Sequence, residues 1–494
     1  VWTGPSQMNG LFAWESDDGF FAIRYDPAGS GTTVFCRTGG DWRPAYCGTG
    51  LKAGVVANGT RTCGILGACV GGGVAPGTAA AAGLRLRRVE AFPAVLGLDQ
   101  LEAWAFPART AKGSVRARTD VRDPNGPKRV LELPPGPGNP RNSEGSFIKL
   151  KDGRLLMIYT RYNGKGGGDD EPAVLSQRES RDGGLTWSSE SVDIIRNEGN
   201  GNNVMSVSLL RLANGEIALF YLRKTRDAGC FPVVRFSRDE AKTWSKPVKC
   251  LDEAHSGVCV LNNDRAIQLP CGRILLPIAR HCATPNGPDM MGQIFCLYSD
   301  DSGRTWKKTE PEFRAFEPDG RRIKLQEPGV VALKDGRVML WIRTDGGREL
   351  VCYSSDRGET WTKPVKTDIH CPCAPVSIKR LQNGDLLMAW NDHRGHPELK
   401  PLHVYHAGTR SPLVLAVSKD DGRTWQKRKV LEGNVYDGGW YCYTAIHEEG
   451  DAVLLEYCCM QHLCHSRITR VPLAWLYGPD PDGGPTTIRG YFND

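Results

Sequence analysis

One eight-residue pattern recurs five times along the chain, at intervals of 55 to 64 residues. It has the form S-x-D-x-G-x-T-W, with the glycine replaced once, by Ala241. The copies begin at Ser180, Ser237, Ser299, Ser354 and Ser418. Ser and Asp side chains bond nearby backbone N–H groups, Gly supplies a positive φ, and Trp packs a large face against the turn. Five copies at one period predict a repeat architecture.

A second repeat lies between these turns. It has the form L-x-x-G-x followed by an aliphatic residue, and it occurs at 150–155, 212–217, 269–274, 333–338 and 381–386. Each copy is typical of a strand, a tight turn and a strand. Every period therefore holds two hairpins, or four strands, which is one blade of a β-propeller.

These repeats predict an all-β fold, a six-bladed β-propeller with an extra N-terminal β-rich region. Five blades are expected at 141–195, 200–253, 258–315, 322–370 and 373–432. A sixth is expected from Tyr436 to about Leu476, with its hairpin at 449–451, and residues 129–133 would close the ring as an outer strand. Residues 1–125 lack the repeat, so the expected domains are 1–125, of unknown role, and 126–494, the propeller.

Composition limits the partners. The net charge is +7 and no long basic run is present, which argues against nucleic acid. No segment is apolar enough to span a membrane, and no cofactor or metal is expected. The chain has 17 Cys, an odd number, and pairs such as Cys458/Cys459 favour disulfides or buried thiols over a metal site. The first residue is Val1, which fits signal removal or only a boundary chosen for expression; a secreted or periplasmic monomer or homodimer is expected.

The eight-residue turn is the Asp-box, or BNR repeat, and five copies make the chain resemble the sialidase (neuraminidase) superfamily. In that family the Asp-box faces away from the active site, so function depends on residues between the boxes. The resemblance implies a carboxylate clamp of three arginines, because guanidinium forks bind a carboxylate from several sides. Arg343 matches the second arginine, sixteen residues after Glu327, and Arg410 matches the third, before the fifth Asp-box.

The first arginine departs from the family pattern. The family usually shows Arg-Ile-Pro, whereas this chain has Arg141-Asn-Ser-Glu144 at the corresponding place. Glu144 adds a carboxylate near the floor of the expected pocket. It could orient Arg141, contact the sugar or indicate a different ligand.

The resemblance also implies the catalytic groups. Tyr443 is the candidate nucleophile, with Tyr441 as its competitor because both have the same parity along a strand. Glu327 would polarise the tyrosine. A phenol suits a sialic acid substrate, because the carboxylate on the anomeric carbon of that sugar repels a charged nucleophile. The acid/base would be Asp170, with Asp169 second, on a loop containing four glycines.

Other polar residues near the inner strands are possible sugar contacts: Arg161, Asn203, Arg265 and His281. The favoured function is an exo-sialidase that hydrolyses terminal α-linked sialic acids with retention. Two alternatives stay open. One is a propeller glycosidase or lyase acting on another acidic sugar or a uronic-acid polysaccharide, and the other is a non-catalytic propeller that binds glycans.

Overall fold

The computed structural model describes fifteen stretches of the chain: 10–16, 19–25, 32–38, 41–48, 86–92, 125–196, 201–225, 229–251, 257–284, 287–310, 312–394, 410–433, 440–459, 465–479 and 488–489. The chain divides into two compact units. One consists of Val1–Val121 with Val435–Gly438, and the other of Arg122–Asn434 with Gly439–Asp494.

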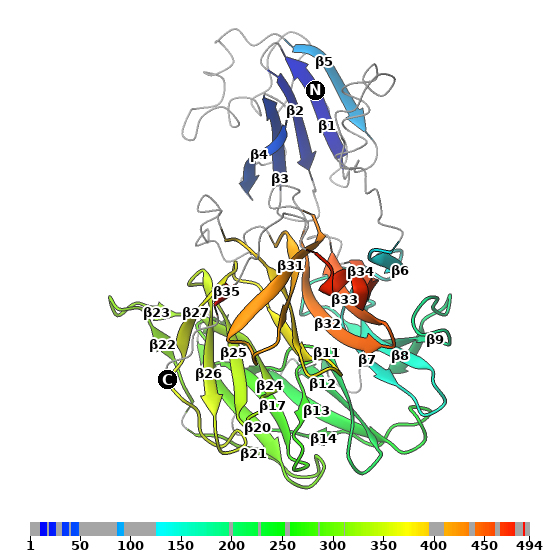
Figure 1. The fold of residues 1–494 in the computed structure, drawn as a ribbon. Helices are drawn as coiled ribbons and strands as arrows, with labels where there is room; N and C mark the ends of the chain where they lie inside the picture. The colour runs from blue at the N-terminus through cyan, green and yellow to red at the C-terminus, as the bar shows by residue number, and fades with distance from the viewer. Residues whose placement is uncertain are drawn as a thin grey trace. The chain divides into compact units, whose positions relative to one another are not determined.

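The first unit contains a five-stranded antiparallel sheet with the order β4-β3-β2-β1-β5 (Figure 1). Its strands are β1 (Gly10–Ser16), β2 (Gly19–Tyr25), β3 (Thr32–Thr38), β4 (Asp41–Gly48) and β5 (Leu86–Phe92).

The second unit is built from strands that follow one another in up-and-down order, as the hairpin repeats predict (Figure 1). The first set is β7 (Arg141–Lys149), β8 (Leu155–Tyr162), β9 (Ala173–Ser180) and β10 (Val192–Ile195). The second is β11 (Gly201–Arg211), β12 (Ile217–Thr225), β13 (Gly229–Ser237) and β14 (Val248–Lys249). The third is β15 (Val258–Val260), β16 (Ile267–Gln268), β17 (Ile274–His281), β20 (Gln293–Ser299) and β21 (Lys307–Lys308).

The later sets repeat the arrangement. The fourth is β24 (Leu325–Ala332), β25 (Val338–Thr344), β26 (Arg348–Ser354) and β27 (Val365–His370). The fifth is β28 (Ser377–Arg380), β29 (Leu386–Asn391), β30 (Leu413–Ser418), β31 (Thr424–Glu432) and β35 (Ile488–Arg489). The last is β32 (Cys442–Glu449), β33 (Ala452–Cys459), β34 (His465–Pro472) and β6 (Lys128–Leu133). We call each set a blade.

Short elements complete the described part of this unit. They are β18 (Ala283–Thr284), β19 (Gly287–Pro288), β22 (Ala315–Phe316), β23 (Arg322–Ile323) and the helix α3 (Leu473–Tyr477). In the stretches that the structure describes, no helix has the length and apolarity that crossing a bilayer demands. The prediction of an all-β, propeller-like fold is confirmed.

Six hydrophobic clusters lie between consecutive blades, in the described residues, and together they form the core of the ring. Each contains buried side chains from two neighbours, and the sixth joins the last blade to the first. Representative pairs, in ring order, are Ile158 with Leu219, Phe220 with Leu276, Leu275 with Leu340, Met339 with Met388, Leu415 with Leu455, and Leu454 with Met157. Burial of these faces stabilises each blade against its neighbours.

The ring is closed by β6, which comes from before the first blade in the sequence. It pairs antiparallel with β34, with Leu133 opposite Ser466 and Glu132 opposite Arg467. This confirms the predicted closing strand at 129–133. The pairing covers an edge that β34 would otherwise leave open.

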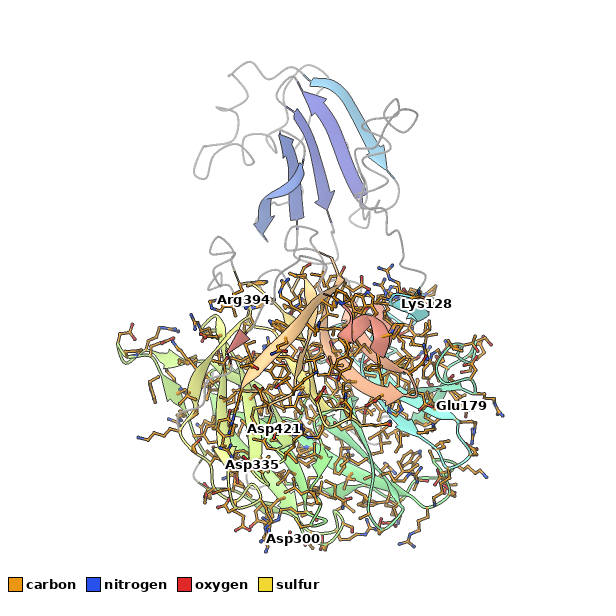
Figure 2. All side chains as sticks on the ribbon, viewed as in Figure 1. Lys128, Glu179, Asp300, Asp335, Arg394 and Asp421 are labelled. Carbon is orange, nitrogen blue, oxygen red and sulfur yellow. The ribbon has the colours of Figure 1, made fainter. Side chains whose placement is uncertain are left out.

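The five Asp-box turns share one hydrogen-bond pattern. In the first copy the Gly184 N–H donates to the Ser180 hydroxyl at 2.9 Å, and the Thr186 N–H donates to the Asp182 carboxylate at 2.9 Å. The other copies repeat these bonds at Ser237, Ser299, Ser354 and Ser418. Ala241 takes φ +63° where the other copies have glycine. Asp300, on the third Asp-box turn, and Asp335, on the hairpin turn at 333–338, are both exposed (Figure 2).

Candidate active site

Four inner strands have a β-bulge at equivalent positions. Each bulge changes the direction of one polar side chain. The pairing register shifts at Glu144 in β7, Ser206 in β11, Glu327 in β24 and Tyr443 in β32. All four residues have positive φ, between +38° and +60°. A non-glycine residue in this region is uncommon, and such bulges concentrate next to active sites. The four bulges therefore mark a candidate site.

Tyr443 and Glu327 meet from different blades. The Tyr443 hydroxyl donates to Glu327 Oε1 at 3.2 Å, and the other carboxylate oxygen of Glu327 accepts a short hydrogen bond from Arg343 Nη1. Burial, followed by the nearby Glu327 carboxylate, raises the pKa of the Tyr443 phenol well above its usual value. The proton therefore stays on the tyrosine, with a carboxylate placed to receive it.

The backbone of Tyr443 is held in place by Asn263. The side-chain amide of Asn263 donates both to the Tyr443 carbonyl and to the Gly145 carbonyl, each at 2.9 Å. One side chain thus fixes the bulges of the first and last blades relative to each other.

Arg410 lies beside the same tyrosine. Its guanidinium carbon is 4.3 Å from the centre of the Trp440 ring and 5.6 Å from that of Tyr443. Arg410 is buried, and its Nε and Nη1 atoms have no hydrogen-bond partner among the described residues; the same holds for Nε of Arg343. Buried guanidinium N–H groups normally find acceptors, so these donors are available to an anionic ligand.

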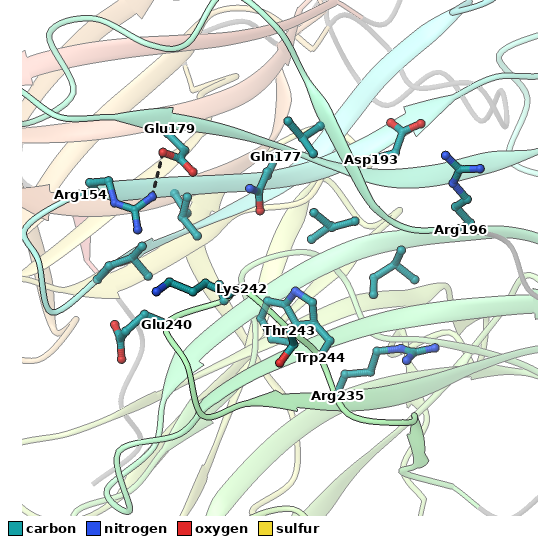
Figure 3. Close-up of a pocket in the computed structure, with 16 residues that line it drawn as sticks. Arg154, Gln177, Glu179, Asp193, Arg196, Arg235, Glu240, Lys242, Thr243 and Trp244 are labelled. Carbon is teal, nitrogen blue, oxygen red and sulfur yellow. Dashed lines mark hydrogen bonds and ion pairs between the residues drawn. The ribbon is translucent and has the colours of Figure 1, made fainter.

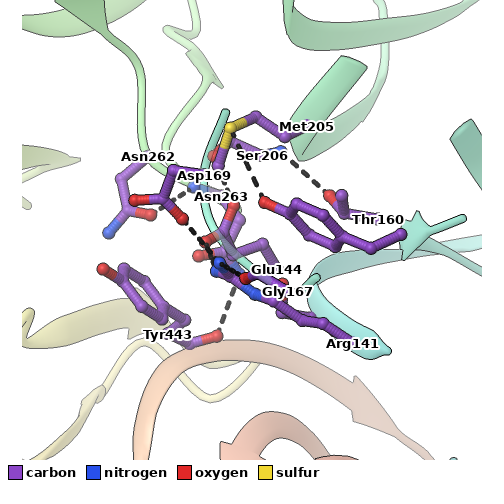
Figure 4. Close-up of polar contacts among 12 residues, drawn as sticks. Arg141, Glu144, Thr160, Gly167, Asp169, Met205, Ser206, Asn262, Asn263 and Tyr443 are labelled. Carbon is purple, nitrogen blue, oxygen red and sulfur yellow. Dashed lines mark hydrogen bonds and ion pairs between the residues drawn. The ribbon is translucent and has the colours of Figure 1, made fainter. Parts of the chain in front are cut away.

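Arg141 is the most heavily bonded of the three arginines. It is only 6% exposed, and its guanidinium donates to Asp169 at 2.5 Å, Glu144 at 2.9 Å and the Gly167 carbonyl at 3.2 Å (Figure 4). Its guanidinium carbon also lies 4.6 Å from the centre of the Tyr162 ring. These contacts hold the Arg141 guanidinium in one orientation.

Glu144 is a fully buried carboxyl group between two blades. One oxygen accepts from Arg141, and the other accepts from the Ser206 hydroxyl at 2.7 Å (Figure 4). Burial raises the pKa of Glu144 to about 7, although Arg141 acts in the opposite direction. Glu144 can therefore change its protonation state near neutral pH.

The glycine-rich loop before β9 brings Asp169, and not Asp170, to Arg141. Desolvation would raise the pKa of Asp169, but Arg141, followed by Lys224 and Arg410, acts against it and the pKa is lowered; the Asp169 side chain is 64% exposed. Asp170 instead pairs with Lys224 at 2.7 Å, and its side chain is 84% exposed. The Asn203 amide and the Lys224 ammonium both donate to the Asp169 carbonyl, at 2.6 and 3.1 Å. Two side chains of the second blade thus set the direction of Asp169.

The loop glycines permit close packing. A Cβ atom on Gly164 would lie 2.4 Å from a carboxylate oxygen of Glu171, and one on Gly167 would lie 3.2 Å from Cβ of Arg141. A larger residue at Gly164 would displace Glu171, and one at Gly167 would push the loop from Arg141.

The arginines influence the pKa of both Asp169 and Tyr443. Arg141 and Arg410 both lower the pKa of Asp169, and Arg343 and Arg410 both act against the raised pKa of Tyr443. The structure therefore brings the three predicted arginines into one neighbourhood with Tyr443, Glu327 and Asp169.

Four of the remaining sequence candidates have side chains in other contacts, although the Tyr441 N–H donates to the Arg410 carbonyl at 2.8 Å, and Glu327 influences the pKa of both Arg265 and His281. Arg161 pairs with Asp193 at 3.5 Å. Arg265 is buried between blades, where it donates to the Val376 carbonyl at 2.7 Å and lies over the Trp341 ring, and burial lowers its pKa to about 10. His281 contacts the Asp289 carbonyl at 3.1 Å. Tyr441 packs its ring against Tyr457 in the core, because the bulge at Tyr443 breaks the shared parity.

Four residues of the neighbourhood were not predicted from the sequence: Ser206, Lys224, Asn262 and Trp440. Ser206 had a detectable signal, because Glu144, Ser206 and Glu327 each stand nine residues before a hairpin glycine. Asn262 is buried with no partner for its side-chain Nδ2 among the described residues. Figure 4 draws it among the residues around Arg141.

A separate groove lies between the first two blades, and none of the predicted catalytic residues lines it. It encloses about 460 Å³ beside Glu179, Asp193, Arg235 and Trp244 (Figure 3). The candidate site is instead defined by the residues at the bulges.

Comparisons with known proteins agree with this architecture. Residues 164–454, more than half of the chain, match the family described as BNR repeat-like domain. A sialidase of Micromonospora viridifaciens is 28% identical over 313 residues, covering 57% of this chain and 44% of that protein. A sialidase of Bacteroides fragilis is 26% identical over 241 residues, covering 45% and 39%. The chain thus spans less than half the length of these relatives.

Solved structures with the same fold include sialidases. The Hadza microbial sialidase Hz136 superposes with a TM-score of 0.54 at 19% identity, covering 68% of this chain and 66% of that one. Trypanosoma rangeli sialidase in complex with 2,3-difluorosialic acid, titled a covalent intermediate, gives 0.52 at 16% identity, covering 71% and 60%. A protein of unknown function from Dyadobacter fermentans gives 0.53 at 20% identity, covering 70% and 99%.

The five Asp-boxes, the propeller-like ring and the match over residues 164–454 lead to one conclusion. The chain belongs to the BNR repeat-like domain family, within the sialidase superfamily.

Proposed function

We propose that this protein is an exo-acting sialidase that hydrolyses terminal α-linked sialic acids with retention of configuration. The observation that carries the proposal is the contact of the Tyr443 hydroxyl with Glu327, which is itself bonded to Arg343. A glycosidase of this kind is consistent with the relatives named sialidase, although the chain covers less than half of their length.

The substrate carboxylate would be bound by Arg141, Arg343 and Arg410. Support comes from the unpartnered, buried Nε and Nη1 atoms of Arg410 and Nε of Arg343, seen among the described residues. An arginine fork gives a carboxylate strong, directional hydrogen bonds, which a lysine ammonium does not match in geometry.

Tyr443 would attack the anomeric carbon while its proton passes to Glu327. A neutral phenol approaches a carbon that carries a carboxylate without charge repulsion. The resulting glycosyl–tyrosine bond would then be broken by water, which gives net retention.

Asp169 would be the acid/base in preference to Asp170. In the free protein Arg141 lowers the pKa of Asp169, which does not suit a general acid. A substrate carboxylate that takes over the Arg141 guanidinium would remove that interaction, so the pKa of Asp169 would rise on binding. Substrate binding would thus favour the protonated form of Asp169, which a general acid requires.

One observation favours an alternative substrate, which is an acidic sugar other than sialic acid, such as a uronic acid. Glu144 places an additional buried carboxyl group against Arg141. An ionised Glu144 would compete with a substrate carboxylate for the same fork, and this could alter which acid sugar is accepted.

The test is hydrolysis of a fluorogenic α-sialoside by the purified chain, with the corresponding glucuronide in parallel. We expect release from the sialoside, and loss of about 10²-fold or more in kcat for Tyr443→Phe. Tyr441→Phe is the matched control and should retain activity. Mass spectrometry after incubation with a 2,3-difluorosialic acid should find the sugar on Tyr443. Hydrolysis of the glucuronide alone would favour the alternative, and full activity of Tyr443→Phe would refute the mechanism.

A further inference from the structure

The strand that closes the ring brings together three groups that ligate metals. Glu132 lies on β6, Cys459 at the end of β33 and His465 at the start of β34. One ligand atom from each, a carboxylate oxygen, the thiol sulfur and an imidazole nitrogen, lies within 4.8 Å of the other two. This cluster is made of residues that take no part in the proposed hydrolysis.

The strand register explains why the three side chains share one place. Cys459 and His465 are directly opposite each other in the β33–β34 pair, so their side chains lie on the same face. The Cys459 thiol donates to the His465 carbonyl at 3.4 Å, and His465 Nε2 contacts a carboxylate oxygen of Glu132. The groups are held by two ladders of a sheet and not by a loose surface loop.

The donor set suits a borderline transition-metal ion such as Zn²⁺. Zinc binds Cys, His and carboxylate ligands at about 2.0–2.3 Å, so its ligand atoms lie roughly 3–4 Å apart. The three atoms here lie within 4.8 Å of one another, so the widest pair would have to approach by up to about 1–2 Å to bind one ion.

The surroundings hold the carboxylate in position. Arg467 donates to the second oxygen of Glu132 at 2.7 Å, which leaves the first oxygen towards His465. The positive charge of Arg467 would disfavour a cation nearby, but Arg467 also pairs with Glu432 at 2.7 Å. Glu432 also pairs with Arg129 at 2.9 Å, so it offsets only part of that charge, and Arg467 acts as the partner that orients a metal-binding carboxylate.

We infer that Glu132, Cys459 and His465 form a site for a divalent metal ion of the zinc type, which ties the ring-closing strand β6 to the last blade. The thiol proton would be released when the Cys459 sulfur bonds to the ion. The ion would act on the stability of the propeller and would be separate from its chemistry.

The test uses the purified full-length chain, stripped with a chelator and then titrated with Zn²⁺ or Co²⁺. Co²⁺ reports a sulfur ligand through a thiolate-to-metal charge-transfer absorption. We expect this band in the wild type, and a melting temperature several degrees higher with Zn²⁺ than with the chelator. Cys459→Ser should remove the band, and Glu132→Gln and His465→Gln should weaken Co²⁺ binding by about tenfold or more.

Cys352→Ser is the control, because Cys352 is a buried thiol of β26 in another blade. It should retain both the band and the shift in melting temperature. Glu132 and His465 have partly exposed side chains, 37% and 14%, so their variants should fold even if Cys459→Ser does not. The proposal is overturned if Zn²⁺ shifts the melting temperature equally in all variants, if Co²⁺ gives no thiolate band, or if Cys459 is found in a disulfide. None of these readouts depends on sialoside hydrolysis.

Discussion

Asp169 is bonded to the guanidinium of Arg141 across 28 positions of sequence, at 2.5 Å. The same guanidinium is the one expected to receive a substrate carboxylate. If Arg141 binds the substrate as proposed, ligand binding and the protonation state of Asp169 would be coupled through this one side chain.

We expect Asp169→Asn to lose about 10²-fold or more in kcat, because the amide can neither protonate the leaving oxygen nor activate water. Asp170→Asn should stay within a few-fold of the wild type, since Asp170 pairs with Lys224 and not with Arg141. The measurement is steady-state hydrolysis of a fluorogenic sialoside. The reverse order of effects would assign the acid/base role to Asp170.

Glu144 should give KM a pH dependence near neutrality. Its pKa is raised to about 7 by burial, so above this pH a carboxylate neutralises Arg141 and below it the carboxyl group is neutral. We expect KM for a sialoside to rise as the pH passes through 7, and Glu144→Gln to remove most of that rise. KM profiles between pH 5.5 and 8.5 check this. Ser206→Ala, which removes the hydroxyl donor to Glu144, should move the rise to higher pH. A pH-independent wild-type KM would contradict the prediction.

Two other buried carboxyl groups should make the fold less stable in mildly alkaline solution. Burial raises the pKa of Glu349 and of Glu456 to about 8 each. The folded state then holds protons that the unfolded state has already lost, so the free energy of unfolding should fall as the pH rises from about 4.5 to about 8, and level off above that. His281 acts in the opposite sense, but only below pH ~6.5, because its pKa is lowered.

The check is urea denaturation between pH 6.5 and 8.5. Glu349→Gln should make the decline with pH shallower, since Glu349 can no longer titrate. An unchanged slope in this variant would show that Glu349 is not among the groups responsible.

Gly329 follows the bulge at Glu327 and leaves room for Trp341. A Cβ at this position would lie 2.1 Å from Cζ2 of the indole. Gly329→Ala should lower the free energy of unfolding by about 1–3 kcal/mol, because the buried indole cannot move away without strain. Gly136→Ala is the control, since nothing lies within 4 Å of its added Cβ. Thermal or urea unfolding compares the two, and equal stabilities would contradict the packing argument.

Asp264 links three other blades through one carboxylate. It accepts from the Ser146 hydroxyl at 3.0 Å, the Lys379 ammonium at 2.8 Å and the Ile446 N–H at 2.9 Å. Asp264→Ala should cost about 3 kcal/mol of unfolding free energy, because it leaves buried donors without an acceptor. Asp152→Ala, on an exposed turn, should change it much less. Urea denaturation measures both, and similar values would show that the link contributes little.

The repeats in the sequence were sufficient for the architecture. Both hairpins of a blade are encoded locally, by turn residues and strand patterns, so the order of the strands and the closing strand at 129–133 could be predicted. The grouping of Glu327, Arg343 and Tyr443 could be expected from the family resemblance. Both the architecture and this grouping depend on patterns within short segments of the sequence.

The finer geometry of the site could not be predicted in the same way. Strand parity did not separate Tyr441 from Tyr443, because a bulge at Tyr443 interrupts the alternation. The sequence could not separate Asp169 from Asp170 either. The direction of the loop that carries them is set by Asn203 and Lys224 of the next blade. Such choices arise from contacts between distant segments.

The left-handed bulges at residues 144, 206, 327 and 443 have a consequence for how this pocket can evolve. The backbone at these positions is held by ladder pairing on both sides, so a different side chain that tolerates positive φ would keep the same direction. A single nucleotide change there would alter the chemistry facing the ligand while the ring and its six apolar seams stay as they are. Specificity and folding are thereby encoded at separate positions of the same strands.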